Sequence, residues 1–138
     1  SNFTIAQLDE AIQILGAGKI YTNQVEVHPY LQNDKVVAHC KANNVKVTGY
    51  MPLAVGRIMQ DPTLLRIAST HNVSVAEVAI AWQLQRGLTT IPSSTKKINL
   101  ETNLQALELT LSDDDMAEIK MLNKNERIAN PEFSPYWD

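Results

Sequence analysis

The stretch Asn23-Gln24-Val25-Glu26-Val27 introduces a pattern that recurs at Val45–Tyr50 and at Thr89–Pro92. Each run is short and partly β-branched, breaks into a polar loop, and leads into a segment whose apolar residues have helical spacing. Strands that alternate with helices predict a parallel β/α fold. In such folds the ligand-binding groups gather after the carboxyl ends of the strands, so the residues that follow each run are the first candidates for a site.

The segments between these runs carry helix signals. Thr4 with Gln7 and Ser74 with Glu77 have capping-box spacing, and Asn33 and Ser112 are expected to cap two further helices. We expect two strands over about residues 21–27 and 45–50, and a third strand that ends at Pro92. The expected helices carry Ile5–Leu15, Val36–Cys40, Leu64–His71, Val75–Trp82, Leu100–Leu107 and Met116–Leu122.

Three strands are too few to close a parallel barrel, which needs about eight strands and roughly 250 residues. The sequence therefore predicts an α/β chain that forms the C-terminal half of an eight-stranded parallel β/α (TIM) barrel. Residues 1–138 are expected to be one partial barrel domain, with a C-terminal tail from about residue 123. The chain opens on Ser1 with no methionine, which is typical of a piece of a longer protein.

Composition limits the classes of partner. With 12 basic and 15 acidic side chains the net charge is −3, which is too mild to indicate nucleic acid or an acidic membrane surface as a partner. No stretch approaches the roughly 18 apolar residues of a membrane span, so we expect a cytoplasmic protein without membrane contact. The single cysteine, Cys40, is expected to be a buried hydrophobe.

Two clusters carry candidate chemistry. Ser93–Lys97 combines hydroxyls, two ammonium groups and the start of a helix, which suits either a phosphate or an ordinary solvated helix cap. Tyr50 could stack on a heteroaromatic ring and Gln24 could bond an amide, or both could be ordinary buried residues. Ser1 and Asn2 would add polar groups to the same rim.

Histidine and acidic residues give no catalytic or metal signature. His28, His39 and His71 lack metal-ligand spacing, and a structural role is the better interpretation for each. Asp113–Asp115 are best explained by stabilisation of a helix N-terminus. We therefore predict no metal site and no Ser/His/Asp or Cys/His catalytic set in this chain.

Several motifs occur in an order that resembles the aldo-keto reductase family over essentially the whole chain. They are Ser1-Asn2-Phe3, Asn23-Gln24-Val25-Glu26, His28-Pro29-Tyr30-Leu31, Tyr50-Met51-Pro52-Leu53, Ile91-Pro92-Ser93-Ser94 and Asn103. The resemblance implies an eight-stranded β/α barrel that uses NADPH. Within the family, the chain most resembles a bacterial subgroup that reduces keto-sugar acids and methylglyoxal.

The resemblance also implies roles for individual residues. Ser1, Asn2 and Gln24 would contact the nicotinamide carboxamide, Tyr50 would stack on the ring, and Leu53 would lie at the pyrophosphate. Ser94, Thr95, Lys96 and Asn103 would hold the adenosine end. Where many members have lysine and arginine, this chain has Ser93 and Asn99, and Lys96 and Lys97 could replace that positive charge.

The resemblance places the family's catalytic tyrosine, lysine, aspartate and histidine in the N-terminal half, so no residue of this chain is expected to be catalytic. The parent protein is expected to be an NADPH-dependent reductase of small aldehydes and ketones, with a small carbonyl compound as substrate. The alternatives are a non-catalytic nucleotide-binding barrel and an inactive half-barrel fragment. The whole protein is expected to be monomeric. An isolated half would expose two strand edges and an apolar inner face, and is expected to self-associate.

Overall fold

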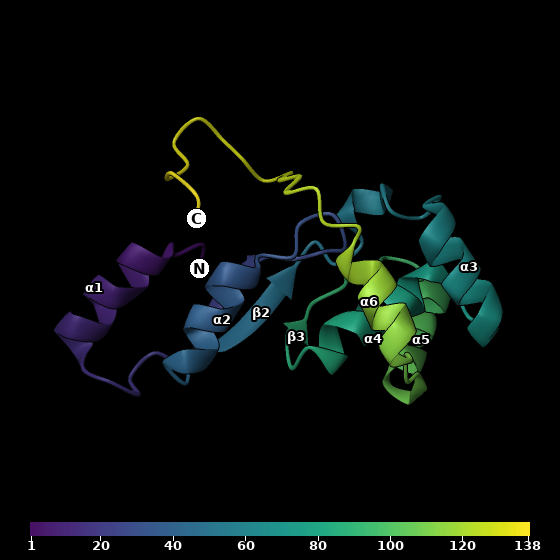
Figure 1. Ribbon diagram of the computed structural model, residues 1–138, viewed down its shortest axis with the longest axis horizontal. Helices are drawn as coiled ribbons and strands as arrows, with labels where there is room; N and C mark the ends of the chain where they lie inside the picture. The colour runs from purple at the N-terminus through teal and green to yellow at the C-terminus, as the bar shows by residue number, and fades with distance from the viewer.

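The computed structural model describes residues 1–138 and contains one parallel sheet flanked by helices (Figure 1). Strand order in the sheet is β1-β2-β3, so neighbours in the chain are neighbours in space. No helix has the length and apolar character needed to cross a membrane. The elements in chain order are α1 (Ile5–Leu15), β1 (Thr22–Glu26), α2 (Asp34–Ala42), β2 (Lys46–Tyr50), the short 3₁₀ helix η1 (Ala54–Gly56), α3 (Pro62–His71), α4 (Val75–Gln85), β3 (Thr89–Thr90), α5 (Lys97–Gln105), η2 (Ala106–Glu108) and α6 (Asp113–Lys120).

The three predicted strands are present, although the third is shorter than expected. Register is regular between β1 and β2, where Gln24 lies opposite Thr48 and Glu26 opposite Tyr50. Pairing in β3 covers only Thr89 and Thr90, with one further backbone bond from Ile91 N–H to the Gly49 carbonyl. No backbone bond joins this strand to β2 beyond Ile91, so the pairing ends there.

Helix starts follow the sequence signals in three cases and depart from them in two. Thr4, Ser74 and Ser112 each form the complete capping box at α1, α4 and α6. Asn33 stands at the start of α2 but makes no side-chain cap, because its side-chain oxygen accepts from Arg127 at 3.3 Å while its NH₂ group donates to the Glu26 carbonyl at 2.6 Å. The hydroxyls of Ser93–Thr95 do not cap α5 either, since that helix begins later, after Lys96.

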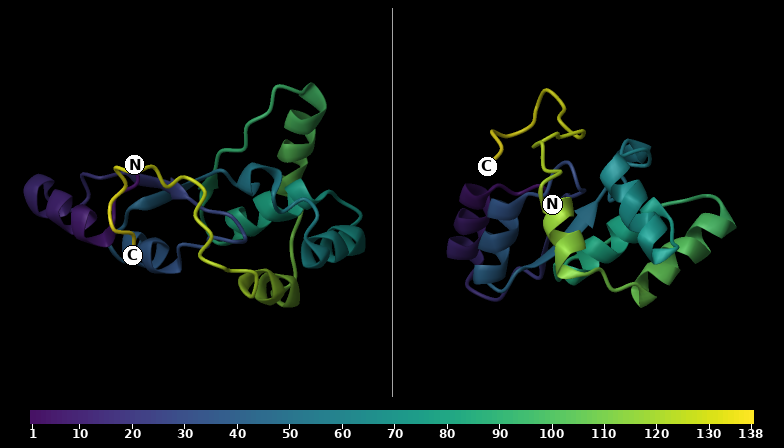
Figure 2. Two further views of the ribbon diagram at one scale, coloured as in Figure 1. Left: turned by 90° about the horizontal axis from the view of Figure 1, so that it is seen from above. Right: turned by 45° about the vertical axis from the view of Figure 1, so that its right-hand side comes forward.

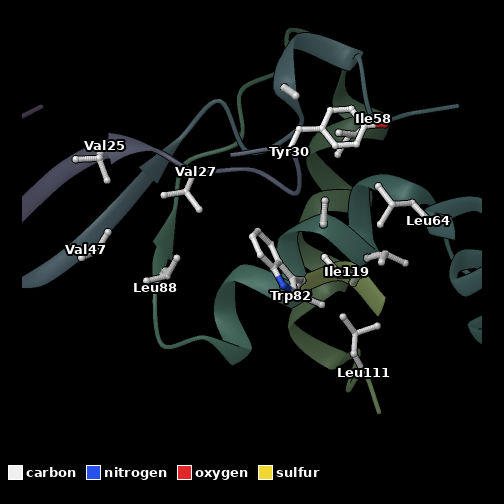
Figure 3. Packing of buried hydrophobic residues seen from close by; sticks show 14 of the residues in the cluster. Val25, Val27, Tyr30, Val47, Ile58, Leu64, Trp82, Leu88, Leu111 and Ile119 are labelled. Carbon is white, nitrogen blue, oxygen red and sulfur yellow. The ribbon is translucent and has the colours of Figure 1, made fainter. Parts of the chain in front are cut away.

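The core lies between one face of the sheet and the helices. Figure 3 shows Trp82 of α4 among Val27, Leu88 and Ile119, and its exposed fraction is only 1%. Gly49 of β2 lets α4 lie close to the sheet, because a Cβ at position 49 would lie 2.5 Å from the Gln83 side chain of α4. Cys40 is fully buried as expected, and burial raises the pKa of its thiol.

The opposite face of the sheet is polar. Its residues of alternate register are Thr22, Gln24, Glu26, Lys46, Thr48, Tyr50 and Thr89, of which only Glu26 is buried. The hydroxyls of Thr22 and Thr48 lie 2.9 Å apart on this face. The expected apolar inner face is therefore wrong, because strand alternation directs Val25 and Val47 toward the helices and the polar residues away from them.

Residues 123–138, which we call the tail, contain no helix or strand and return from α6 toward the N-terminus (Figures 1 and 2). The backbone N–H groups of Lys124 and Glu126 both donate to the Tyr30 carbonyl at 3.0 Å. At the far end, the Asp138 carboxylate accepts from the backbone N–H of Ile5 at the start of α1. The tail thus joins the last helix to the first.

Candidate functional site

Three of the predicted site residues meet at the carboxyl ends of β1 and β2, which we call the rim. The Asn2 backbone N–H donates to the Gln24 carbonyl at 2.7 Å, and the Tyr50 hydroxyl donates to the Asn2 side-chain oxygen at 3.1 Å. Gln24 and Tyr50 are half-buried on the polar face of the sheet, while Ser1 is exposed beside them. The rim therefore presents a flat aromatic ring and amide groups in one place.

Asn23 is the residue that attaches the N-terminal segment to the sheet. Its side chain accepts from the Phe3 N–H at 3.2 Å and donates to the Phe3 carbonyl at 3.0 Å, so the amide imitates the backbone of a neighbouring strand. Asn23 is only 3% exposed, and these bonds satisfy its buried polar atoms. Asn23 holds Phe3 in place, and this positions the preceding residue, Asn2, to accept from Tyr50.

The environment of Tyr50 keeps its hydroxyl protonated. Burial and the charge of Glu26 raise the pKa of Tyr50, and the bond with Asn2 and the nearby Arg127 oppose that rise without cancelling it. At neutral pH the hydroxyl is therefore a donor with a defined partner. A neutral ring held at a fixed angle is suited to stacking against another flat ring.

The loop after β2 and the loop after β3 enclose a cavity of about 390 Å³ next to the rim. No acidic side chain lines it; the lining residues are Met51, Pro52, Leu53, Val55, Gly56, Pro92 and Ser93. The backbone is strained here, since Met51, Ala54 and Val55 all have positive φ, at 51°, 49° and 54°. Such strain at a β-branched residue is rare and is concentrated at functional sites, which makes this loop a candidate part of the site.

The predicted adenosine-end residues are less closely associated with one another. The Ser94 hydroxyl accepts from the Lys96 N–H and from the Asn99 side chain, both at 3.1 Å, while Thr95 and Lys96 are exposed. Asn103 lies farther along α5, where it lines a separate cavity of about 330 Å³ with Pro92 and Leu104. Pro92 borders both cavities and is the point at which the two groups of residues adjoin.

Sequence reasoning missed the partner of Glu26. This carboxylate is fully buried and accepts 2.8 Å bonds from His28 Nε2 and from the backbone N–H groups of Ile128 and Ala129. Burial opposes ionisation, but these three donors outweigh it and hold the pKa of Glu26 below its ordinary value of 4.5. The available signal was a glutamate in a core strand, and no local pattern indicates that two of its partners lie 102 and 103 residues away.

The predicted structural role of His28 is confirmed, because its ring is fully buried and bonded to Glu26. His39 and His71 are likewise bonded to single carboxylates, those of Asp9 and Asp115. No group of three or more histidine, cysteine, aspartate or glutamate side chains is arranged to hold a metal ion.

Residues 1–124, which include every predicted site residue, match the Aldo/keto reductase family. The chain belongs to this family. Among other family members, it is 47% identical over its whole length to the methylglyoxal reductase DkgB of Escherichia coli O157:H7 and 37% identical to the glyoxal reductase of Bacillus subtilis. The match covers 52% of the first of these proteins and 48% of the second, so the chain spans about half the length of the curated relatives it matches.

Solved aldo-keto reductases have the same architecture over the matched region. A structure described as a putative 2,5-diketo-D-gluconic acid reductase B matches 99% of this chain and 50% of its own, with a TM-score of 0.94 and 32% identity. A Gox0644 mutant in complex with NADPH matches 98% of this chain and 50% of its own, with a TM-score of 0.89 and 29% identity. The predicted resemblance to the bacterial 2,5-diketo-D-gluconate and methylglyoxal reductases is thereby confirmed, and the three-stranded parallel sheet is consistent with half of a β/α barrel.

Proposed function

We propose that the protein containing this chain is an NADPH-dependent reductase of small aldehydes and ketones, of the methylglyoxal and 2,5-diketo-D-gluconate type. The observation that carries the proposal is the convergence of Asn2, Gln24 and Tyr50 at the rim beside a cavity without acidic side chains. The names of the similar proteins support the reaction class, and the NADPH complex of one structural neighbour supports the cofactor.

The described residues fit a nicotinamide nucleotide. Gln24 and Asn2 offer the donors and acceptors that a carboxamide needs, and Tyr50 offers the flat face for the ring. The cavity at Leu53 suits a pyrophosphate because it has no carboxylate to repel the charge. Ser94, Thr95, Lys96 and Asn103 would hold the adenosine end, with Lys96 supplying positive charge for a phosphate.

When bound, the cofactor supplies hydride to the carbonyl carbon of the substrate. This chain contributes binding and orientation: the Tyr50–Asn2 bond sets the angle of the ring, and Asn23 holds Asn2 in place through Phe3. A proton must still reach the carbonyl oxygen, and no residue of the rim is placed in that role. The proposal therefore assigns the proton donor to the part of the protein outside this chain.

The test is to compare the full-length protein with the 138-residue chain, after intact mass has verified each sample. We expect the full-length protein to consume NADPH with methylglyoxal, and the chain alone to show no turnover. If the full-length protein binds NADPH by fluorescence titration but reduces neither methylglyoxal nor 2,5-diketo-D-gluconate, the enzymatic proposal fails and a nucleotide-binding role replaces it.

A further inference from the structure

Glu26 joins the rim to the tail. Its buried carboxylate receives the backbone N–H groups of two consecutive tail residues, Ile128 and Ala129, each at 2.8 Å. These bonds connect positions separated by 102 and 103 residues in the chain. His28 Nε2, also at 2.8 Å, completes the set of partners.

A buried carboxylate is a costly way to end a strand. Transfer of the ionised group from water is strongly unfavourable, and only several good donors offset the penalty. The core does not need this charge, since Val25 and Val27 supply the packing of β1 on the helix side. The bonds with Ile128 and Ala129 do, however, fix the path of a segment that has no helix or strand of its own.

The fixed segment lies beside the rim. Glu26 is the register partner of Tyr50, so the carboxylate sits next to the proposed stacking residue. Arg127, which directly precedes the clamped residues, stacks over the Trp137 ring at 3.7 Å and donates to the Asn33 side chain at 3.3 Å. The charge of Arg127 also opposes the rise of the Tyr50 pKa.

We propose that Glu26 is a positioning residue that holds tail residues 127–130 beside Tyr50 as one wall of the substrate pocket. The inference rests on the proposed reductase function. Glu26 itself does not contact the reacting atoms; it acts through the tail. Loss of the clamp should therefore weaken substrate binding while leaving the nucleotide contacts at Gln24 and Leu53 in place.

The test is a Glu26→Gln variant of the full-length protein. The neutral amide of glutamine is a weaker acceptor than the carboxylate of Glu26. Its NH₂ group, itself a donor, can also face the tail N–H groups and leave them without an acceptor. We expect KM for methylglyoxal to rise by about tenfold, within the ~100-fold that a 1 Å misplacement can cost. The kcat and the Kd for NADPH, measured by fluorescence titration, should each stay within about twofold.

A second variant, Ala129→Pro, removes one of the two clamping N–H groups without changing Glu26. If Glu26 acts through the tail, the KM effects of the two single variants should be strongly non-additive in the double variant. Glu132→Gln is the matched control, because Glu132 is an exposed tail residue, and it should leave KM unchanged. The positioning role would be overturned if the KM effects of the two variants were additive. It would also be overturned if Glu26→Gln lowered kcat and NADPH affinity by the same factor as it raised KM.

Hydrogen exchange at the Ile128 and Ala129 amides provides a readout that does not depend on activity. We expect both amides to be protected in the wild-type protein and to exchange faster in Glu26→Gln. Rapid exchange in the wild type would show that the clamp does not exist, even if the enzyme is active. If the wild-type amides are protected but the protein has no reductase activity, the proposed function is overturned. The clamp would then exist, but its role in a substrate pocket would be overturned as well.

Discussion

The rim and the segment from Ser93 to the end of α5 differ in how their polar groups are satisfied. At the rim, buried side chains bond to backbone that is distant in sequence, as Asn23 does with Phe3 and Glu26 with Ile128. In the Ser93–Gln105 segment the side-chain hydrogen bonds are local, between residues no more than five positions apart, and no residue of α5 is buried. The first region is therefore held by bonds between distant parts of the chain, whereas the second is held by bonds within its own segment and by the packing of α5 on α4.

The strongest test of this difference is Glu26→Ala. Removing a fully buried, triply bonded carboxylate leaves His28 and two backbone donors without an acceptor, so we expect the free energy of unfolding to fall by about 3–5 kcal/mol. Urea unfolding followed by far-UV circular dichroism measures it. A loss below about 1 kcal/mol, comparable with an exposed substitution such as Glu132→Ala, would remove the distinction between the two regions.

Acid should weaken the rim through the same residue. Because the pKa of Glu26 lies below its unfolded value of 4.5, the carboxylate stabilises the fold above that value, and this stability is lost as pH falls through the folded pKa. Asp115, bonded to His71 and Ser112 across the start of α6, has a pKa below 3.8 and adds stability of the same sign. We expect Glu26→Gln to have a shallower dependence of stability on pH below about 5 than the wild type. Parallel pH profiles for the two proteins would contradict this assignment.

Asn23→Ala should separate the N-terminal segment from the sheet. The substitution removes both bonds to Phe3 and leaves its backbone groups to find other partners, at a cost of about 1–3 kcal/mol. Asn2 should then lose its fixed position under Tyr50, so NADPH affinity should fall together with stability. Thermal unfolding and NADPH titration on the same samples check both effects. Retained NADPH affinity in a destabilised variant would show that Asn2 is not part of the site.

Lys96→Gln tests the opposite behaviour in the α5 segment. Lys96 is exposed, whereas Lys97 pairs with Glu101 at 3.5 Å, so Lys96 is the cation free to meet a phosphate. We expect unchanged stability and a Kd for NADPH that is weaker by roughly 10- to 150-fold, with a much smaller change for NADH, since a charge-assisted contact with the 2′-phosphate is worth about 1.5–3 kcal/mol. Lys97→Gln is the matched control. Equal losses for both nucleotides would place Lys96 elsewhere on the cofactor.

The two regions also differ in what the sequence could predict. The capping boxes at Thr4 and Ser74 and the cap at Ser112 were readable because each lies within four residues. The role of Asn33 was not, since its side chain is engaged by Glu26 and Arg127, and a cap signal says nothing about partners from elsewhere in the chain. The order of strands and helices predicted only where a site would lie, at the strand ends, and the roles of single residues came from the family resemblance. The strained loop at Val55 and the tail clamp depend on tertiary contacts that local patterns do not encode.

The smallest expected effect concerns the apolar side of α5. Leu104 is 67% exposed, and with Leu100 and Pro92 it lines the cavity beside Asn103. In the chain produced by itself, Leu104→Lys should change the free energy of unfolding by less than about 0.5 kcal/mol, because an exposed side chain has little packing to lose. The same substitution should reduce self-association in sizing chromatography, since a charge interrupts the exposed apolar surface formed with Leu107. The polar inner face of the sheet is a poor alternative contact surface. An unchanged elution profile would therefore indicate pairing through the strand edges. A variant with a charged residue in place of Thr89 on β3 would then test whether the β3 edge forms that contact.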